Sequence, residues 1–463
     1  MKIKSVVKFV WGFLVSGCVF SFAQQTAYLN FTIEAGVGHL VQSFAPAKLS
    51  VETVPLESTA IHLNGILSNF SGNLSIDSDI DLGQINSAGK CIANHTPISF
   101  NGRNVTINGN GHVIKNLCAD ISITNPSSQG YRDTLGFFKN LDSVTVENLK
   151  FENVRFSIAE GATRAPGADN GLLYAGVGTL AGYIRHSTIS NVSLTSVKLV
   201  SPFAGGIAGY VEKSTFKNIT STDPIEISNR ILINNGVVGS GGNGAPQGAH
   251  SAVFLGGLVG FSYDLSIADV DISVSLRDEA GNPRAGIGGL VGQFGYTSEQ
   301  DSAGKLIVEN VKVGARENAL LENGKMMGGF FGETCRLRNS GKGGDLVILN
   351  SSFNGKFSNA QGDTAYVGGF VGKNLLDKGG SIEVIKSQSN VDISDDLRNA
   401  SPNYYYAGGL VAWGSSDINY SFKDKPHALI SFVDSKVSGQ SGLSAKSVSD
   451  IVSILKNALK YAQ

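Results

Sequence analysis

The sequence is poor in charge, in cysteine and in long apolar segments. Charged residues make up 16% of its 463 positions, whereas about 25% is usual in globular proteins. The 37 basic and 38 acidic side chains nearly cancel. No block of lysine and arginine occurs, which argues against a nucleic-acid or anionic-membrane surface. Beyond the N-terminal region no run of about 18 apolar residues occurs, so no transmembrane helix is predicted.

Motifs for nucleotide, hydrolase and metal chemistry are also missing. The sequence contains no phosphate-binding loop, no Gly-x-Ser-x-Gly and no EF-hand loop. Its one Gly-x-Gly-x-x-Gly string, at 239–244, lies in a glycine-rich stretch with no helix predicted after it. No Cys-x-x-Cys pair occurs, and the histidines are too scattered for a zinc site. We predict no metal, no cofactor and no catalytic residue. The histidines are His39, His62, His95, His112, His186, His250 and His427.

Glycine, in contrast, is abundant and regularly placed. It accounts for 58 residues, and many belong to a recurring phrase, Gly-Gly-Leu-Val-Gly and its variants. The closing positions, 182, 209, 260, 292, 332, 372 and 412, are separated by 27, 51, 32, 40, 40 and 40 residues. The minimal unit is therefore 27 residues, lengthened by insertions. The closing glycines, to which we assign a structural role, are Gly182, Gly209, Gly260, Gly292, Gly332 and Gly372.

A second phrase, a short β-branched run around Asn or Asp, follows these copies of the first. Asn191, Asn218 and Asp269 lie nine residues after the closing glycine, and Asn310 and Asn350 lie eighteen residues after it. If the units stack in register, the asparagines form a ladder of side-chain amides that satisfies backbone groups of the turns.

The period and the composition together predict an all-β fold, a parallel β-solenoid. A unit of 27 residues suits one coil of two or three short strands and is too short for a helical repeat. Two neighbouring apolar columns run through the glycine phrase, one containing Ile207 and the other Ala208. A straight strand would bury only one of them, and the sequence leaves open whether the glycines bend the chain. We expect these glycines to allow positive φ at corners and close backbone approach between coils.

The N-terminus has the features of an export signal. Three lysines precede an uncharged apolar stretch, and the small residues Ser21 and Ala23 flank a predicted cleavage before Gln24. Lipid attachment at Cys18 is the alternative, because Val-Ser-Gly-Cys is similar to a lipobox. The predicted divisions are a signal peptide at 1–23, an N-terminal cap at 24–70, a β-helix at 71–440 and a C-terminal amphipathic helix at 441–463.

Export permits disulfides, and three cysteines follow the signal region. Cys91 and Cys118 are 27 residues apart, one minimal coil, so they are predicted to lie one above the other and to pair. Cys335 then has no partner within the mature chain. At the other end, the helix predicted within 441–463 either covers the last coil or binds a partner.

Candidate ligand-binding residues are few. Tyr404, Tyr405 and Trp413 cluster near the last repeat and are predicted to bind carbohydrate by stacking. Tyr406 matches Tyr366 in the repeat, so a stacked column explains both. Two sets of carboxylates have the alternate spacing of one strand face, and a structural role is preferred for them: Asp77, Asp79 and Asp81, and Asp269 with Asp271. Irregular insertions are the other candidates: 161–175, 228–252, 293–305, 333–345 and 395–405.

The repeat resembles the GLUG-motif family, named for Gly-Leu-x-Gly, over about residues 135–440. The match is direct at 257–260 and 289–292. The resemblance implies a bacterial secreted or surface protein, adhesin-like, and the early coils are similar to right-handed parallel β-helices. Some relatives are immunoglobulin-A-cleaving metallopeptidases with a separate zinc domain, but this sequence contains no His-Glu-x-x-His, so that activity does not follow.

These features predict an exported bacterial protein, secreted or at the cell surface, extracellular or in the outer membrane. Its expected role is recognition or adhesion, with a carbohydrate or a cell-surface or matrix ligand, or a structural one, without catalysis. Two alternatives stay open. One is a β-helix polysaccharide lyase or glycoside hydrolase, and the other is a passenger fragment of a larger surface protein.

Overall fold

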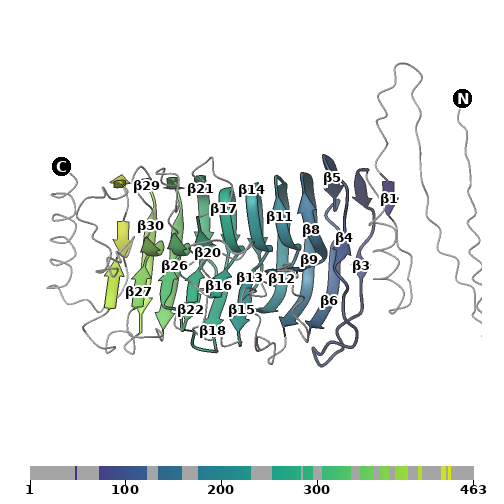
Figure 1. Cartoon of the computed structure of the whole chain (residues 1–463), viewed down its shortest axis with the longest axis horizontal. Coiled ribbons are helices and arrows are strands. Elements are labelled where there is room, and N and C mark those ends of the chain that lie inside the picture. Colours follow the sequence, from purple (N-terminus) through teal and green to yellow (C-terminus); the bar gives the residue numbers. More distant parts are fainter. Residues whose placement is uncertain are drawn as a thin grey trace, which may run out of the picture.

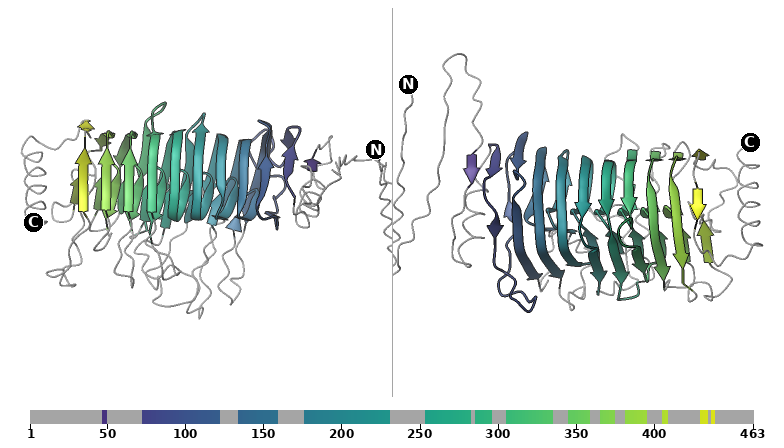
Figure 2. Two further views of the ribbon diagram at one scale, coloured as in Figure 1. Left: turned by 90° about the horizontal axis from the view of Figure 1, so that it is seen from above. Right: turned by 180° about the vertical axis from the view of Figure 1, so that it is seen from behind.

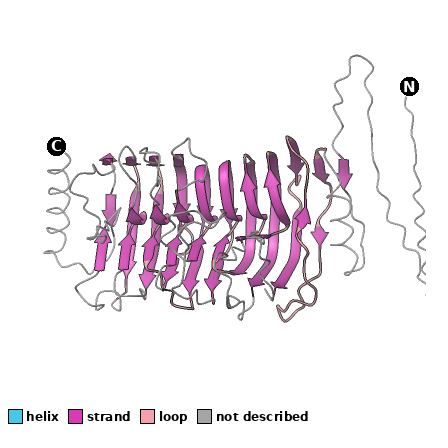
Figure 3. Cartoon of the chain, in the orientation of Figure 1, coloured by secondary structure: helices cyan, strands magenta, loops and turns pink. Residues whose placement is uncertain are grey.

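The structure, a computed structural model, describes these residues: 47–49, 72–121, 134–158, 176–230, 253–282, 285–295, 305–334, 345–358, 365–374, 381–394, 405–408, 429–433 and 436–438. The chain is all-β over this part, without a helix (Figure 3). No helix long and apolar enough to span a membrane occurs in this part. The predicted all-β class is confirmed. The predicted signal peptide at 1–23, Cys18 and the predicted helix at 441–463 lie outside the described residues.

The strands stack coil upon coil into a parallel β-solenoid, which confirms the predicted architecture. Figure 1 shows the coils following one another along the long axis, and Figure 2 shows the same stack from above and from behind. Twenty-five strands form one hydrogen-bonded network and eight form a second sheet. The named strands of the described residues pair in parallel, each with the equivalent strand of a neighbouring coil.

The smaller sheet contains one short strand from each coil from residue 134 onward. These strands are β7 (Thr134–Leu135), β10 (Gly176–Gly178), β13 (Phe203–Gly205), β16 (Val253–Gly256), β19 (Ala285–Gly288), β23 (Met326–Gly328), β27 (Ala365–Gly368) and β31 (Tyr405–Gly408). β7 pairs with β10 and β10 with β13, and the ladder continues in chain order to β31.

The larger network covers the remaining sides of the coils. In the early coils it contains β1 (Ala47–Leu49), β2 (Leu74–Ile76), β3 (Ile80–Asp81), β4 (Ile98–Ser99), β5 (Val105–Asn108), β6 (Val113–Ile121), β8 (Phe138–Asp142), β9 (Val144–Ile158), β11 (Ala181–Arg185), β12 (Thr188–Val200), β14 (Ala208–Ser221) and β15 (Ile225–Asn229). In the later coils it contains β17 (Val259–Ile272), β18 (Val274–Asp278), β20 (Val291–Phe294), β21 (Lys305–Val313), β22 (Ala319–Glu322), β24 (Phe331–Thr334), β25 (Asp345–Leu349), β26 (Ser352–Ser358), β28 (Val371–Asn374), β29 (Ser381–Ile385), β30 (Gln388–Ile393), β32 (Leu429–Val433) and β33 (Lys436–Ser438).

Each coil turns at residues in the left-handed backbone region. In the coil between Gly178 and Gly205 these are His186, Asn191 and Ser196, with φ of 48°, 53° and 52°. They lie five residues apart, so each side of the coil between them is only a few residues long. Asparagine tolerates this region better than other non-glycine residues because its side chain bonds locally. Turn positions are therefore set by asparagine more often than by glycine.

The asparagine ladder exists. The Asn191 side-chain amide donates to Asn148 Oδ1 at 2.8 Å, and the Asn218 amide donates to Asn191 Oδ1 at 2.6 Å. Farther along, Asn310 donates to Asp269 Oδ1 at 3.1 Å. These bonds confirm the predicted ladder at these positions. Asn350 occupies the same turn of the next coil with a φ of 48°.

The repeat glycines act by close approach and not by positive φ. None of the closing glycines from Gly182 to Gly372 has a positive φ, so that part of the prediction is wrong. A Cβ on Gly292 would instead lie 2.7 Å from the Gly260 carbonyl oxygen and 2.7 Å from the Leu255 nitrogen, both in the backbone. The sheets meet backbone to backbone here, and only glycine fits.

The glycine phrase also bends the chain, which decides between the two apolar columns. β13 ends at Gly205 and β14 begins at Ala208, so the direction changes at 206–207. Ile207 and Ala208 are both fully buried in consequence. The equivalent residues of the other described coils are buried as well, and both columns belong to one continuous core.

Cys91 and Cys118 form a disulfide, with their Cα atoms 5.7 Å apart. Cys118 lies in β6, and Cys91 lies in the loop after β3, the strand of the preceding coil that pairs with β6. The bond therefore joins the first two described coils of the stack. Cys335 lies outside the described residues.

Candidate functional site

A groove of about 410 Å³ lies on the outer face of four neighbouring strands, β9, β12, β15 and β18, which Figure 1 shows side by side. Its charged lining comes from all four strands and from the residues that follow β15 and β18. The cationic residues are Arg155, Lys198, Arg230 and Arg277, and the acidic ones are Glu226 and Glu279.

Strand alternation places these side chains outside. In β12, Lys198 and Val200 face the groove, whereas Leu199 between them is buried in the core. The parallel register then aligns equivalent positions of successive coils: Arg155 pairs with Lys198, and Lys198 with Glu226. The charged side chains thus form rows along the stack, on a backbone fixed by hydrogen bonds on both sides.

One row of the groove lining consists mainly of short side chains. Ser157, Val200 and Ser228 are register partners in three successive coils, and Arg277 occupies the same position in the fourth. Small residues between longer charged ones leave the hollow. The serine hydroxyls can each donate one hydrogen bond and accept others.

Three of the groove's cations form ion pairs with carboxylates of neighbouring coils. Lys198 Nζ lies 3.0 Å from Glu226 Oε1, and Arg230 Nε lies 2.9 Å from Glu279 Oε2. Arg277 pairs in the same way with Glu322 of the next coil. The side chains of Lys198 and Glu226 are 57% and 53% exposed, so their attraction is weakened by water and contributes little to stability. Such pairs can open when a ligand competes.

A buried carboxylate supports the far side of the groove. Asp278 accepts hydrogen bonds from the Asn229 side chain at 2.7 Å and from the Asn282 side chain at 3.0 Å. Burial raises the pKa of Asp278, and these neutral donors oppose the rise only in part. Because this cluster is fully buried, it fixes the turn that presents Arg277 and Glu279.

The first coil reaches the groove from the other side. Arg155 donates a hydrogen bond of 2.8 Å to the carbonyl oxygen of Gly89. That glycine lies two residues before Cys91, so the disulfide anchors the loop that contacts Arg155.

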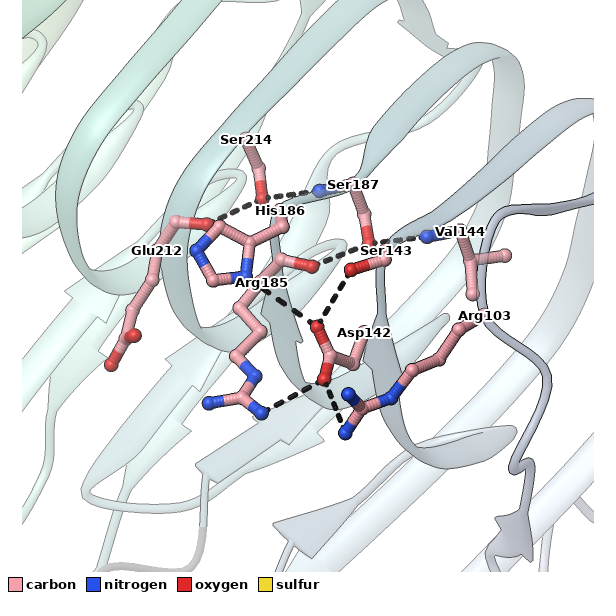
Figure 4. Close-up of polar contacts among 9 residues, drawn as sticks. All are labelled: Arg103, Asp142, Ser143, Val144, Arg185, His186, Ser187, Glu212 and Ser214. Atoms are coloured by element: carbon pink, nitrogen blue, oxygen red, sulfur yellow. Dashed lines mark hydrogen bonds and ion pairs between the residues drawn. The ribbon is translucent and has the colours of Figure 1, made fainter.

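A second charged cluster surrounds Asp142, at a corner of the stack (Figure 4). Its carboxylate accepts a hydrogen bond of 2.8 Å from Arg185 and lies 3.1 Å from Arg103 and 3.5 Å from His186 Nδ1. Partial burial raises the pKa of Asp142, but the hydrogen bonds from Arg185 and Ser143 outweigh it and hold the pKa below its usual range. A carboxylate with this many partners stabilises the corner and is poorly suited to proton transfer.

The serines of the same corner are also fully engaged. The Ser187 hydroxyl donates to the Arg185 carbonyl at 2.7 Å and accepts from the Val144 N–H at 3.1 Å. The Ser214 hydroxyl repeats this one coil later, because it donates to the Glu212 carbonyl and accepts from the Ser187 N–H (Figure 4). They bridge coils and do not form a catalytic serine site with His186.

Comparison with known proteins identifies no family. No model of a protein family matches the sequence, and no curated protein matches it at a significant level. One solved structure, that of a putative immunoglobulin A1 protease from Bacteroides ovatus, is similar over 86% of this chain and 85% of its own, with 15% sequence identity and a TM-score of 0.40.

The carboxylates singled out in the sequence have local partners. Asp79 accepts hydrogen bonds from the Val113 N–H and the His112 ring, which lower its pKa. Asp81 accepts from Asn116 at 2.7 Å. The other three are engaged too: Asp77 with Ser75, Asp269 with Asn310 and Asp271 with Arg316.

Most of the aromatic residues predicted to bind carbohydrate by stacking lie outside the described residues. Tyr404 and Trp413 lie outside the described residues, and Tyr405 is described only as the register partner of Ala365 in β31. Tyr406 does pair with Tyr366, as expected from the repeat. The insertions at 161–175, 228–252, 293–305, 333–345 and 395–405 also lie mainly outside the described residues.

The histidines that the structure describes, His95, His112 and His186, do not gather at one site. His95 is buried between the rings of Phe137 and Phe156, at centroid distances of 5.7 and 6.4 Å, and His112 pairs with Asp79. In the part of the chain that the structure describes, no group of three His, Cys, Asp or Glu side chains could hold a metal.

The groove was not predicted, although the sequence contains a signal for it. Arg155 and Lys198 each lie seven residues after a ladder asparagine, Asn148 and Asn191. Aligning the units on that asparagine column would have placed the two cations in one row. The glycine phrase alone hides this alignment, because in the coil of Arg155 the phrase is reduced to Leu-Gly-Phe-Phe at 135–138 and has no closing glycine.

Proposed function

We propose that this chain is an exported bacterial recognition protein, secreted or at the cell surface, that binds a carbohydrate or a host-matrix ligand in the charged groove without catalysis. The supporting observation is the groove itself, a hollow of about 410 Å³ with four cations and two carboxylates on one rigid face. Side chains fixed on paired strands are pre-organised, which reduces the entropy lost on binding.

Four further assignments belong to this proposal. We propose that the coil is right-handed, in accordance with the general handedness of parallel strand crossovers. The repeat is assigned to the GLUG-motif group on the phrase at 257–260 and 289–292. Export is assigned to a signal peptide at 1–23, with lipid attachment at Cys18 as the alternative. A passenger role within a larger surface protein is compatible with the same binding function.

The rival function is that of a β-helix polysaccharide lyase or glycoside hydrolase. Its best support is that Glu226 and Glu279 face the same groove, because glycoside hydrolysis usually needs two carboxylates. Both already form ion pairs with cations of the groove, Glu226 with Lys198 and Glu279 with Arg230, and such pairing suits a binding surface better than a pair of catalytic carboxylates.

Binding and catalysis are separated by one experiment on the mature chain, residues 24–463. The protein is applied to an array of glycans and matrix proteins, and the bound glycans are then assayed for new reducing or unsaturated ends. Binding without product supports the recognition role. Release of such ends, lost in Glu226→Gln or Glu279→Gln, would establish the enzyme instead. Retention of no ligand at all would contradict both.

A further inference from the structure

We infer that the groove on β9, β12, β15 and β18 takes an acidic polysaccharide, a chain of hydroxylated sugars with carboxylate or sulfate groups. This inference rests on the proposed recognition function and specifies its ligand. Three properties of the groove support it: its charge, the absence of aromatic anchors among its lining residues, and the nature of its partners within the protein.

The balance of charge favours an anion. The lining residues comprise four cations and two carboxylates, and counting Glu322, which pairs with Arg277 from the next coil, the local charge is +1, on a chain whose formal charge is −1. Three of the four cations are arginines, whose planar guanidinium binds carboxylate and sulfate groups through paired hydrogen bonds. Lys198, Arg230 and Arg277 have side chains about half exposed, so a ligand can reach them without displacement of the core.

The lining argues against a peptide or a nucleic acid. Among the described residues that form the groove, none is aromatic, whereas protein partners are usually anchored by buried aromatic or apolar side chains and single-stranded nucleic acids by stacked aromatics. The strands beneath are paired in parallel on both sides, so no free edge is available for an added peptide strand. The serine hydroxyls and the charged side chains of the lining match an acidic sugar chain.

The cations already hold oxygen acceptors of the kind the ligand would supply. Glu226 Oε1 lies against Lys198, and the Gly89 carbonyl oxygen accepts from Arg155. An incoming carboxylate replaces a carboxylate, so the cations keep a charged partner throughout. It follows that Glu226 and Glu279 compete with an acidic ligand, whereas they would assist a neutral one by accepting hydrogen bonds from its hydroxyls.

This competition determines whether each variant is expected to weaken or to strengthen binding. Binding of the mature chain is measured by titration calorimetry with polygalacturonate (carboxylate), dextran sulfate (sulfate), neutral dextran and poly-glutamate, at two salt concentrations. The groove variants are Lys198→Gln, Arg230→Gln and Arg277→Gln, and separately Glu226→Gln. The matched control is Lys217→Gln, an exposed lysine whose partner, Asp269, lies at the asparagine corner. Circular dichroism on heating verifies that each variant is folded.

The inference predicts binding to polygalacturonate, to dextran sulfate or to both, and the stronger of the two identifies the anionic group. Affinity falls as salt rises. Each cation-to-Gln change weakens binding about tenfold, Glu226→Gln leaves it equal or tighter, and Lys217→Gln leaves it unchanged.

Three results would overturn the inference. They are binding to neutral dextran as tight as to the acidic polymers, equal binding of poly-glutamate, and acidic-polymer affinity unchanged by the three cation variants. A fourth result would overturn the ligand class alone. If neither acidic polymer binds but a neutral glycan or a matrix protein on the array does, the recognition function still stands.

Discussion

His95 shows how this fold changes the chemistry of a single residue. Burial lowers its pKa from the usual 6.5 to about 4, while the hydrogen bond to the Phe137 carbonyl, 3.0 Å from Nε2, opposes the shift. Because a carbonyl oxygen only accepts, Nε2 must be the protonated nitrogen of the neutral ring. The ring lies between Phe137 and Phe156, which leaves a positive charge there without solvation.

The pH dependence of the early coils follows from this shift. The unfolded chain takes up a proton at about pH 6.5 and the folded chain only near pH 4, so folding stability falls as pH decreases through this window. The loss levels off below pH 4 at about 3 kcal/mol. We expect hydrogen exchange in β6 and β9 to accelerate from pH 7 to pH 4.5, after correction for intrinsic exchange. His95→Gln, which does not titrate, should show little of this change, and an equal change in the variant would contradict the assignment.

Asn191 tests the ladder at the same scale. Its φ is 53°, and its amide bonds to both neighbouring coils. Asn191→Ala loses these bonds and places a less tolerant residue in the left-handed region, at a cost of about 2 kcal/mol. Asn191→Gly loses only the bonds, about 1 kcal/mol. Urea unfolding measures both values, and equal destabilisation by Ala and Gly would show that φ plays no part.

The asparagine ladder was predictable from the sequence because asparagine recurs, with little variation, at the same turn of successive coils. Two further ladders were not predicted. Asn153 donates to Asn116 at 2.7 Å, and Asn390 donates to Asn354 at 2.8 Å. Their columns change residue type along the stack, as at Ser196, the register equivalent of Asn153. At the turn of Asn153 any residue able to adopt positive φ fits, so the pattern fades in the sequence. Asn354 and Asn390 are instead register partners within β26 and β30.

At the scale of the element, the glycine phrase is the feature that the sequence explained only in part. Its period predicted the coil. Of the two roles predicted for its glycines, close backbone approach is correct and positive φ is wrong. Positive φ belongs mainly to Asn, Asp, Ser and Lys positions, while the phrase glycines let two strands meet without side chains between them. Sequence period alone does not separate these roles, because glycine is favoured by both.

Gly292→Ala tests the close approach. The added methyl group would lie 2.7 Å from two backbone atoms, Gly260 O and Leu255 N, and backbone cannot move aside without disturbing the coil. We expect destabilisation of about 3 kcal/mol or more in urea unfolding.

Gly111→Asn is the matched control for that substitution. Gly111 has a φ of 79° and no atom within 4 Å of an added Cβ, and asparagine tolerates this region, so we expect a change below about 0.5 kcal/mol. Similar losses in both variants would show that glycine freedom, and not contact, matters at position 292.

At the scale of the whole molecule, each coil pairs its strands with those of its neighbours, and only a few side chains, such as Arg155 to Gly89, reach a coil farther, so stability is distributed along the stack. The disulfide between Cys91 and Cys118 stabilises the first described coils. We expect the double variant Cys91→Ser, Cys118→Ser to lose about 3 kcal/mol of local stability there. Hydrogen exchange should accelerate over 72–121 and stay unchanged in β26 and β30. Uniform acceleration along the chain would indicate a single cooperative unit.

The architecture of the whole molecule was predictable and its binding face was not. The backbone geometry restricts which residue types fit at the repeat positions. The stacking of coils, the asparagine ladder and the apolar columns could therefore be derived from the spacing of those residues. The groove depends on which outward-facing positions carry long charged side chains and which carry short ones, such as Lys198 and Val200. The backbone geometry does not restrict the residue type at those positions. Its residues also come from four coils whose separations differ, with Arg155, Lys198 and Glu226 brought into one row only by the register.

Arginine footprinting shows directly whether the groove is the binding surface. The mature chain is labelled with phenylglyoxal, alone and saturated with the tightest ligand of the array, and modified arginines are quantified by mass spectrometry. We expect ligand-dependent protection of Arg230 and Arg277 in the groove, with labelling of Arg103 at the Asp142 corner unchanged. Equal labelling of Arg230 and Arg277 with and without ligand, or protection of Arg103 instead, would contradict it.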